Sequence, residues 1–166
     1  PRAIPGIKFL EREKTWIAPS GASLWLRYLD RDDDVSRYQG QAFNWIGFDE
    51  LTQWPTPFAW NYMRSRLRTT ASSGLPLCMR ATTNPGGSGH HWVKNAFIDP
   101  APSNTSFDAT DEHGEIIRFP KNHARVGEPL FKRRFIPANL FNNPYLSDDG
   151  MYEANLLSMP EQQRRQ

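Results

Sequence analysis

The chain has little cysteine and no long apolar run. Its single cysteine, Cys78, excludes an internal disulfide and is typical of a reducing compartment. No stretch approaches the ~20 consecutive apolar residues that a membrane-spanning helix needs, and no signal peptide is recognisable. We therefore expect a soluble, intracellular protein with no membrane partner. The first residue is Pro1 rather than methionine, which favours a piece of a longer polypeptide.

The chain also lacks a strong net charge and a phosphate-binding glycine loop. With 20 basic and 18 acidic residues the formal net charge is +2, so a nucleic-acid surface is compatible with the total but not implied by it. The glycine-rich run at 86–89 lacks the Gly-Lys-Ser/Thr ending of such a loop. The length of 166 residues and the hydrophobic content of 38% are those of one globular domain.

The most informative segment that is present is FNWIGFDE, residues 43–50. An apolar run without helical spacing ends there on two adjacent carboxylates, Asp49 and Glu50. Such a run predicts a buried strand, central in a parallel sheet, whose carboxyl end is where ligands bind. In nucleoside triphosphate hydrolysis, one acid holds the magnesium shell while the next polarises the attacking water. An acidic cap on a following helix is the alternative.

A second predicted strand, residues 75–81, repeats this arrangement. It follows a crossover that contains a predicted helix, and it ends on Thr82, Thr83 and Asn84. Two parallel strands joined by a helix form a βαβ unit, which places these three residues beside the acidic pair. A polar side chain there can bond the attacking water or the γ-phosphate of a nucleotide. An ordinary turn at the strand end is the alternative.

The helix between these strands begins after Glu50. Thr52 is a candidate cap, and the prolines at 55 and 57 suit a first turn. Its expected apolar face consists of Phe58, Tyr62 and Leu67. It carries the basic residues Arg64, Arg66 and Arg68, and it is predicted to end at residues 72–74.

The remaining segments predict short elements with polar connections. They are a hairpin over 14–29, a solvated acidic turn at 30–34 rather than a metal site, a short helix or extended segment at 91–98, a loop or hairpin excursion over 99–130, a strand within 131–140, and a helix over 148–166 capped by Asp148 or Asp149.

Several ordered stretches together resemble one protein family. They are TWIAPSGASLWLRYLDRDDDVSRYQGQAFNWIGFDELTQWP, SRLR, RATTNPGGSGHHWVKNAFIDP, RRFIPANLFNNPYL and YEANLLSMPEQQRRQ. In this order and spacing, the chain resembles the large terminase subunit of tailed bacteriophages and prophages over nearly its whole length. The expected fold is α/β, with a central, mainly parallel sheet and flanking helices, as part of an ASCE-type P-loop NTPase domain.

The resemblance implies a DNA-packaging motor. In that family an N-terminal ATPase domain drives translocation into procapsids, and a C-terminal nuclease domain cuts concatemeric DNA. Residues 1–166 would form a partial ATPase domain between a Walker A loop upstream and the nuclease downstream, with 131–166 starting a smaller subdomain or linker. The implied cofactors are ATP and Mg²⁺. The implied partners are double-stranded DNA, the small terminase subunit, the portal protein and further copies in a ring, in the bacterial host cytoplasm.

The resemblance also implies roles for individual residues. Asp49 matches the Walker B aspartate that organises Mg²⁺ through water, and Glu50 matches the glutamate that activates the attacking water. Thr82, Thr83 and Asn84 fall at the motif that couples hydrolysis to movement of a subdomain.

Other candidate residues have a structural alternative. Arg66 or Arg68 is a candidate phosphate-sensing or finger arginine, or else part of a solvated helix face. Adjacent His90 and His91 are more typical of solvent-facing side chains than of metal ligands. The aromatic residues Trp54, Phe58, Trp60 and Trp92 favour core packing over stacking on bases. The basic residues Lys132, Arg133, Arg134, Arg164 and Arg165 either contact DNA phosphates or form a solvated edge.

Two other functions stay open. One is a non-catalytic assembly or binding module, in which the acidic pair caps a helix. The other is a different ASCE-type DNA-dependent ATPase, such as a helicase-like motor. Because these 166 residues contain no P-loop, we expect little or no ATPase activity from them alone.

Overall fold

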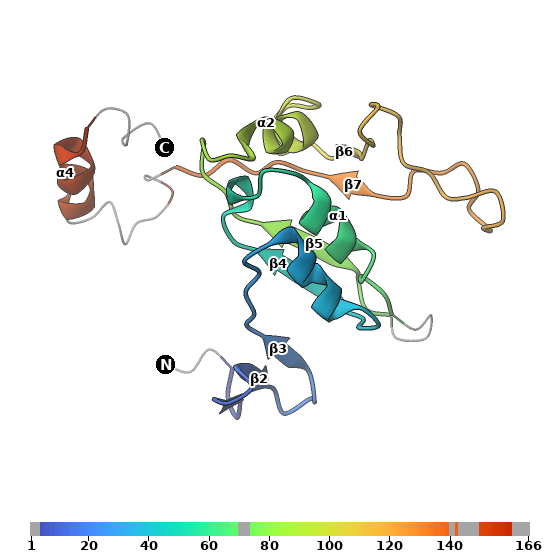
Figure 1. Cartoon of the computed structure of the whole chain (residues 1–166), viewed down its shortest axis with the longest axis horizontal. Coiled ribbons are helices and arrows are strands. Elements are labelled where there is room, and N and C mark those ends of the chain that lie inside the picture. Colours follow the sequence, from blue (N-terminus) through green and yellow to red (C-terminus); the bar gives the residue numbers. More distant parts are fainter. Residues whose placement is uncertain (1–3, 70–73, 140–141, 143–149, 161–166) are drawn as a thin grey trace. The chain divides into compact units, whose positions relative to one another are not determined.

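The computed structural model describes residues 4–69, 74–139, 142 and 150–160, shown in Figure 1. The chain divides into two compact units, Pro1–Gln41 and Ala42–Gln166. Among the helices of the described segments, none is both long enough and apolar enough to cross a membrane.

The first unit contains a small antiparallel sheet. Its strands are β1 (Lys8–Leu10), β2 (Thr15–Ile17) and β3 (Ser23–Trp25), in the order β1-β2-β3. The predicted hairpin is confirmed as β2 and β3, and Gly21 supplies the left-handed turn conformation between them at φ 84°. Strand β1 adds a third strand that the sequence pattern did not indicate.

The acidic turn begins a 3₁₀ helix, η1 (Asp32–Tyr38). Asp34 Oδ2 accepts the backbone N–H groups of Asp30 at 2.9 Å and Arg31 at 3.1 Å, and Asp34 Oδ1 lies 2.8 Å from Arg37 Nη2. The two backbone hydrogen bonds lower the pKa of the Asp34 carboxyl group, and Arg37 adds to the effect. Within the described residues, no three acidic, histidine or cysteine side chains gather to hold a metal ion.

The second unit is built around a βαβ arrangement. Strand β4 (Trp45–Phe48) leads through the 3₁₀ turn η2 (Leu51–Gln53) and helix α1 (Phe58–Arg64) to strand β5 (Cys78–Ala81). The two strands pair in parallel, with Trp45 opposite Cys78 and Phe48 opposite Ala81. The predicted parallel neighbours are therefore confirmed.

The prediction of a central, mainly parallel sheet with flanking helices is wrong. In the described residues the parallel sheet consists of β4 and β5, and the other strands form separate small sheets. With one neighbour each, these strands are not enclosed: Ile46 is buried, but Trp45 is 50% and Leu77 46% exposed. The prediction that both strands are buried is therefore also wrong, because an apolar run indicates a strand but not how many strands lie beside it.

Helix α1 is shorter than predicted and packs through another face. It ends at Arg64, and Leu67 instead forms an isolated bridge to Phe43. The buried residues of α1 are Ala59, Trp60 and Met63, whereas Phe58, expected on the apolar face, is 49% exposed. The expected end, residues 72–74, falls mainly outside the described residues. The helical spacing alone did not distinguish the two faces, because both carry aromatic side chains.

The core of the second unit is aromatic. Leu51, Trp60 and Val93 are buried together, and the partly buried side chains packed against them are Phe48, Trp54, Met79, Trp92 and Phe97. The Trp60 ring lies 5.5 Å from the rings of both Phe48 and Phe97. Core packing is thus confirmed for the three tryptophans predicted to pack, and exposed Phe58 is the exception.

The rest of the second unit follows the predicted order. Helix α2 (His90–Val93) continues into the π-helical turn η3 (Lys94–Ile98), which confirms the short helix. The hairpin excursion over 99–130 is confirmed by the antiparallel bridges Thr110–Ile116 and Arg118–Pro129. Its strand β6 (Phe107–Asp108) pairs antiparallel with β7 (Lys132–Arg133), which confirms the strand predicted within 131–140. Helix α4 (Met151–Ser158) lies within the predicted terminal helix. The predicted caps Asp148 and Asp149, and the basic residues Arg164 and Arg165, lie outside the described residues.

Candidate functional site

The parallel pairing brings Thr82 to the acidic pair. Thr82 N donates to Phe48 O at 3.0 Å, and Leu51 N donates to Thr82 O at 2.9 Å, so backbone bonding continues past the strand ends. The Thr82 hydroxyl group donates to Asp49 Oδ1. One oxygen of the exposed Asp49 carboxylate is thereby oriented by the neighbouring strand.

Glu50 has an unusual backbone conformation. Its φ of 51° and ψ of 54° lie in the left-handed region, which costs a residue other than glycine about 1 kcal/mol or more. Its N–H donates to Thr82 Oγ1 at 3.3 Å. Although Glu50 directly precedes η2, its side chain makes no capping hydrogen bond to that turn. The alternative in which this carboxylate caps a helix is therefore not supported.

A relay of hydrogen bonds joins η2 to the end of β5. Thr52 N donates to Thr83 Oγ1 at 3.2 Å, Thr83 Oγ1 donates to Thr52 Oγ1 at 3.0 Å, and Thr52 Oγ1 donates to Asn84 O at 3.1 Å. Thr52 is only 4% exposed, so its polar groups need these partners. The prediction of Thr52 as a helix cap is wrong. Sequence reasoning missed its real contacts because they depend on the strand register.

The glycine-rich loop packs its backbone directly against η2. Gly89 N donates to Thr52 O at 2.8 Å. A Cβ atom at Gly89 would lie 1.9 Å from Trp54 O, and one at Gly87 would lie 2.5 Å from Thr52 O. These glycines are therefore required for close packing between two backbone segments.

The adjacent histidines have different environments. His90 Nδ1 accepts the N–H of Gly86 at 3.1 Å, which occupies the lone pair that a metal ion would need at that atom. His91 is exposed, as predicted, while His90 is half-buried.

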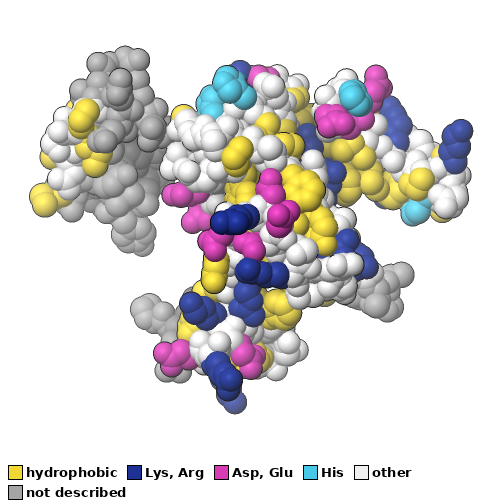
Figure 2. Space-filling view, in the orientation of Figure 1, with side chains coloured by type: hydrophobic (Ala, Val, Ile, Leu, Met, Phe, Trp, Pro, Cys, Tyr) yellow, Lys and Arg dark blue, Asp and Glu magenta, His cyan; other side chains and the backbone are white. Residues whose placement is uncertain are grey.

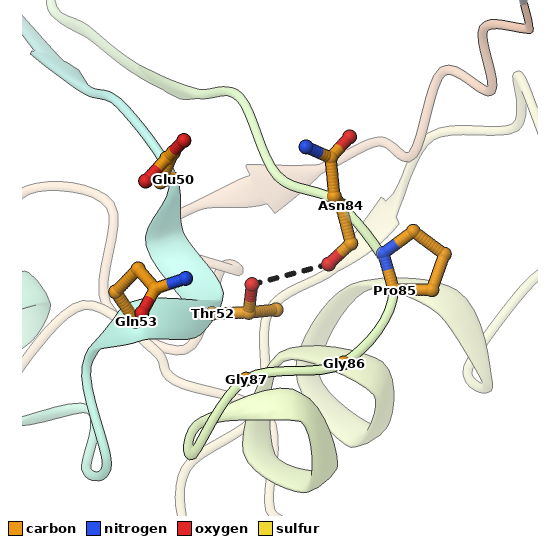
Figure 3. Close-up of a pocket in the computed structure, with 7 residues that line it drawn as sticks. All are labelled: Glu50, Thr52, Gln53, Asn84, Pro85, Gly86 and Gly87. Carbon is orange, nitrogen blue, oxygen red and sulfur yellow. Dashed lines mark hydrogen bonds between the residues drawn. The ribbon is translucent and has the colours of Figure 1, made fainter. Parts of the chain in front are cut away.

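A small polar pocket opens beside Glu50. Figure 3 shows Glu50 and Asn84 on either side of Thr52, where the loop after β5 passes close to η2. The pocket has a volume of about 180 Å³, below the ~300 Å³ at which small-molecule pockets begin. Its lining residues are Glu50, Thr52, Gln53, Asn84, Pro85, Gly86 and Gly87.

The two candidate arginines lie on the other side of the βαβ unit. Phe43 N donates to Arg66 O at 2.9 Å, and Arg68 N donates to Phe43 O at 3.1 Å, before β4 begins. At about 3.3 Å per residue, Asp49 is roughly 20 Å further along the strand. The Arg66 guanidinium group bonds Ser65 Oγ at 2.9 and 3.0 Å. Their role as phosphate-sensing or finger arginines stays a prediction.

Comparisons of this chain with protein-family models, with curated proteins and with solved structures found no match. The local geometry of the described residues and the resemblance in sequence are therefore what support a function.

Proposed function

We propose that this chain is part of the ATP-hydrolysing motor of a terminase large subunit, which translocates viral DNA into procapsids in the bacterial host cytoplasm. One observation supports this proposal above the others. The parallel β4–β5 pair brings Asp49 and Glu50 together with Thr82, and the Thr82 hydroxyl group bonds the Asp49 carboxylate. Double-stranded DNA, the small terminase subunit, the portal protein and a ring of copies are the proposed partners.

The donor atoms at the strand ends suit Mg²⁺. The Asp49 carboxylate and the Thr82 hydroxyl are hard oxygen ligands, and both residues are exposed. Mg²⁺ is commonly bound by one or two carboxylates together with waters and substrate phosphates, so no closed protein cage is needed. When bound, Mg²⁺ neutralises charge that develops on the phosphate oxygens.

The proposed chemistry assigns separate tasks to the neighbouring residues. Glu50 accepts a proton from the water that attacks the γ-phosphate of ATP in line, and Asp49 holds the metal shell. Thr82 keeps the Asp49 carboxylate in one orientation. The Asn84 side chain lies at the pocket, where its amide can bond the phosphate that reacts. Through Thr52, a displacement of Asn84 is transmitted to the turn that follows Glu50.

Glu50→Gln tests the proposal in a polypeptide that joins these residues to a P-loop. The substitution keeps the size of the side chain and removes its ability to accept the proton, so DNA-stimulated ATP hydrolysis should fall by 100-fold or more, in the range of ~10²–10⁴ for loss of a general base. ATP binding, followed with a fluorescent nucleotide, should persist.

The matched control is Glu112→Gln, which removes an equal charge from an 87% exposed side chain. Hydrolysis should continue in this variant. The 166-residue chain by itself should stay at background, because neither its sequence nor its pocket offers a lysine-bearing phosphate loop. Equal turnover by the Glu50→Gln protein and wild type would refute the proposed role of the acidic pair.

A further inference from the structure

Two half-buried arginines, Arg64 and Arg133, lie outside the pocket at Glu50 and are close enough for their charges to interact. Arg64 is the last residue of α1, and its Cζ atom lies 4.8 Å from the centre of the Phe131 ring. Arg133 belongs to β7, with its Cζ atom 5.2 Å from the Phe97 ring. Arg133 Nη1 also donates to Ala96 O at 3.3 Å. Each guanidinium group is therefore held with one face against an aromatic ring.

The two positive charges act on each other. Burial lowers the pKa of the Arg64 guanidinium group. Burial, and then the positive charge of Arg64, lowers the pKa of Arg133. Arginine keeps its charge throughout the physiological range, so the pair carries two partly desolvated positive charges.

Neither arginine has an acidic partner among the residues that the structure describes. Other basic side chains of the chain do: Arg125 lies 2.7 Å from Glu128, and Lys132, next to Arg133, lies 3.2 Å from Asp108. Figure 2 shows Lys and Arg side chains beside hydrophobic ones where Figure 1 places β6 and β7. Packing explains the aromatic contacts, but it does not explain why two like charges are placed together without a counter-charge.

We propose that Arg64 and Arg133 together bind a phosphate oxyanion, supplied by a nucleic-acid backbone or by free polyphosphate. With a ring against one face, Arg64 keeps its N–H edge for the fork-like contacts that phosphate oxygens accept, and Arg133 keeps the N–H groups that do not bond Ala96 O. Neither arginine lines the pocket at Glu50. The inference does not rest on ATP hydrolysis.

The first arm of the test measures binding of a fluorescein-labelled DNA duplex by anisotropy at several NaCl concentrations. The variants are Arg64→Met and Arg133→Met, because methionine keeps a long side chain that packs on aromatic rings. Each should weaken duplex binding and reduce the slope of log K against log salt by about one. The control, Arg12→Met, removes an exposed positive charge from the first unit and should have little effect.

The second arm measures the melting temperature of the full chain in pyrophosphate against sodium chloride of equal ionic strength. A saturable rise for wild type that is lost in both methionine variants, with duplex binding unchanged, would identify free polyphosphate as the ligand. Loss of duplex binding would identify the nucleic-acid backbone.

If wild type responds to neither duplex nor pyrophosphate, the proposal is overturned, and this outcome does not depend on how the variants fold. A response that persists in both variants overturns it as well. If a methionine variant loses its circular dichroism signal, Arg64→Lys replaces it. Lysine keeps the charge but lacks the planar fork, so it should bind phosphate less tightly than wild type.

Discussion

At the scale of the residue, Glu50 combines a strained backbone with a carboxylate that has no capping contact to the following turn. Residues other than glycine enter the left-handed region at a cost of ~1–2 kcal/mol. Such strain persists where the surrounding structure imposes it, and it is found frequently at functional sites. Here the Thr82 contacts on both sides of the residue impose it, because they fix the N–H of Glu50 and the N–H of Leu51.

Glu50→Gly should therefore raise stability while it removes the proposed base. Relief of the strain exceeds the extra entropy of glycine in the unfolded chain, which costs ~0.4–1 kcal/mol, so we expect a net gain of about 0.5–1 kcal/mol. Urea unfolding followed by tryptophan fluorescence measures this gain. Gln53→Gly in the same turn is the control, and it should lose about 0.5–1 kcal/mol. A Glu50→Gly protein that is less stable than wild type would show that the conformation is not strained.

At the scale of the element, the glycine loop and η2 are joined through their backbones. The Gly89 N–H reaches Thr52 O, and there is no space for a side chain at this position. Gly89 has a negative φ of −93°, so its requirement for glycine is steric rather than conformational.

Gly89→Ala should thus destabilise the second unit. The added methyl group meets the backbone carbonyl of Trp54, which cannot rotate away, and overpacking of this kind costs about 1–3 kcal/mol. A lower urea midpoint should be visible in the fluorescence of the packed tryptophans. Ser88→Ala, the control, loses one exposed hydrogen bond to Gln53 O and should cost about 1 kcal/mol or less. Equal stability of the two variants would show that the loop moves away from η2 at little cost.

The elements near the site were largely predictable, because their signals are local. The apolar run before Asp49 indicated β4, and the polar residues after Ala81 indicated the end of β5. Parallel pairing followed from the helix between them. The end of α1 was not predictable, since Arg66 and Arg68 form backbone bonds with Phe43, a partner far away in the sequence. Such contacts leave no periodic pattern.

At the scale of the whole molecule, both units contain a carboxylate held by backbone N–H groups. Asp34 in the first unit accepts the N–H groups of Asp30 and Arg31. Asp111 in the second unit accepts those of Glu115 at 3.0 Å and His113 at 2.9 Å, and these bonds lower its pKa. Folding thus disfavours protonation of both carboxyl groups.

Both units should lose stability in acid. Because the folded state lowers each pKa below its ordinary value of 3.8, this contribution is complete above that pH and is lost as the pH falls below it. Asp34→Asn and Asp111→Asn keep an acceptor oxygen but do not titrate. In the double variant, the urea unfolding midpoint should depend less on pH than in wild type below about pH 4. The control, Asp33→Asn, changes charge in the same turn as Asp34. An unchanged profile in the double variant would exclude these carboxylates as the cause.

The arrangement of the sheets could not be predicted from the sequence. An apolar strand ending on two acids is compatible with a wide sheet and with a pair of strands, and the described residues form the latter. The number of neighbours depends on contacts between distant segments. Exposed Leu75 and Leu77, apolar residues just before β5, show that their hydrophobicity did not mean burial here.

The backbone contacts between the strand ends also provide a way to watch this region. The backbone N–H groups of Leu51, Thr52 and Gly89 each donate a hydrogen bond between the segment that follows β4 and the segment that follows β5. Separation of the two strand ends exposes all three to solvent, whereas fraying within η2 alone leaves the two ends joined elsewhere. The rate of deuterium uptake at these three amides therefore measures how often the two strand ends separate, without any substitution in the chain.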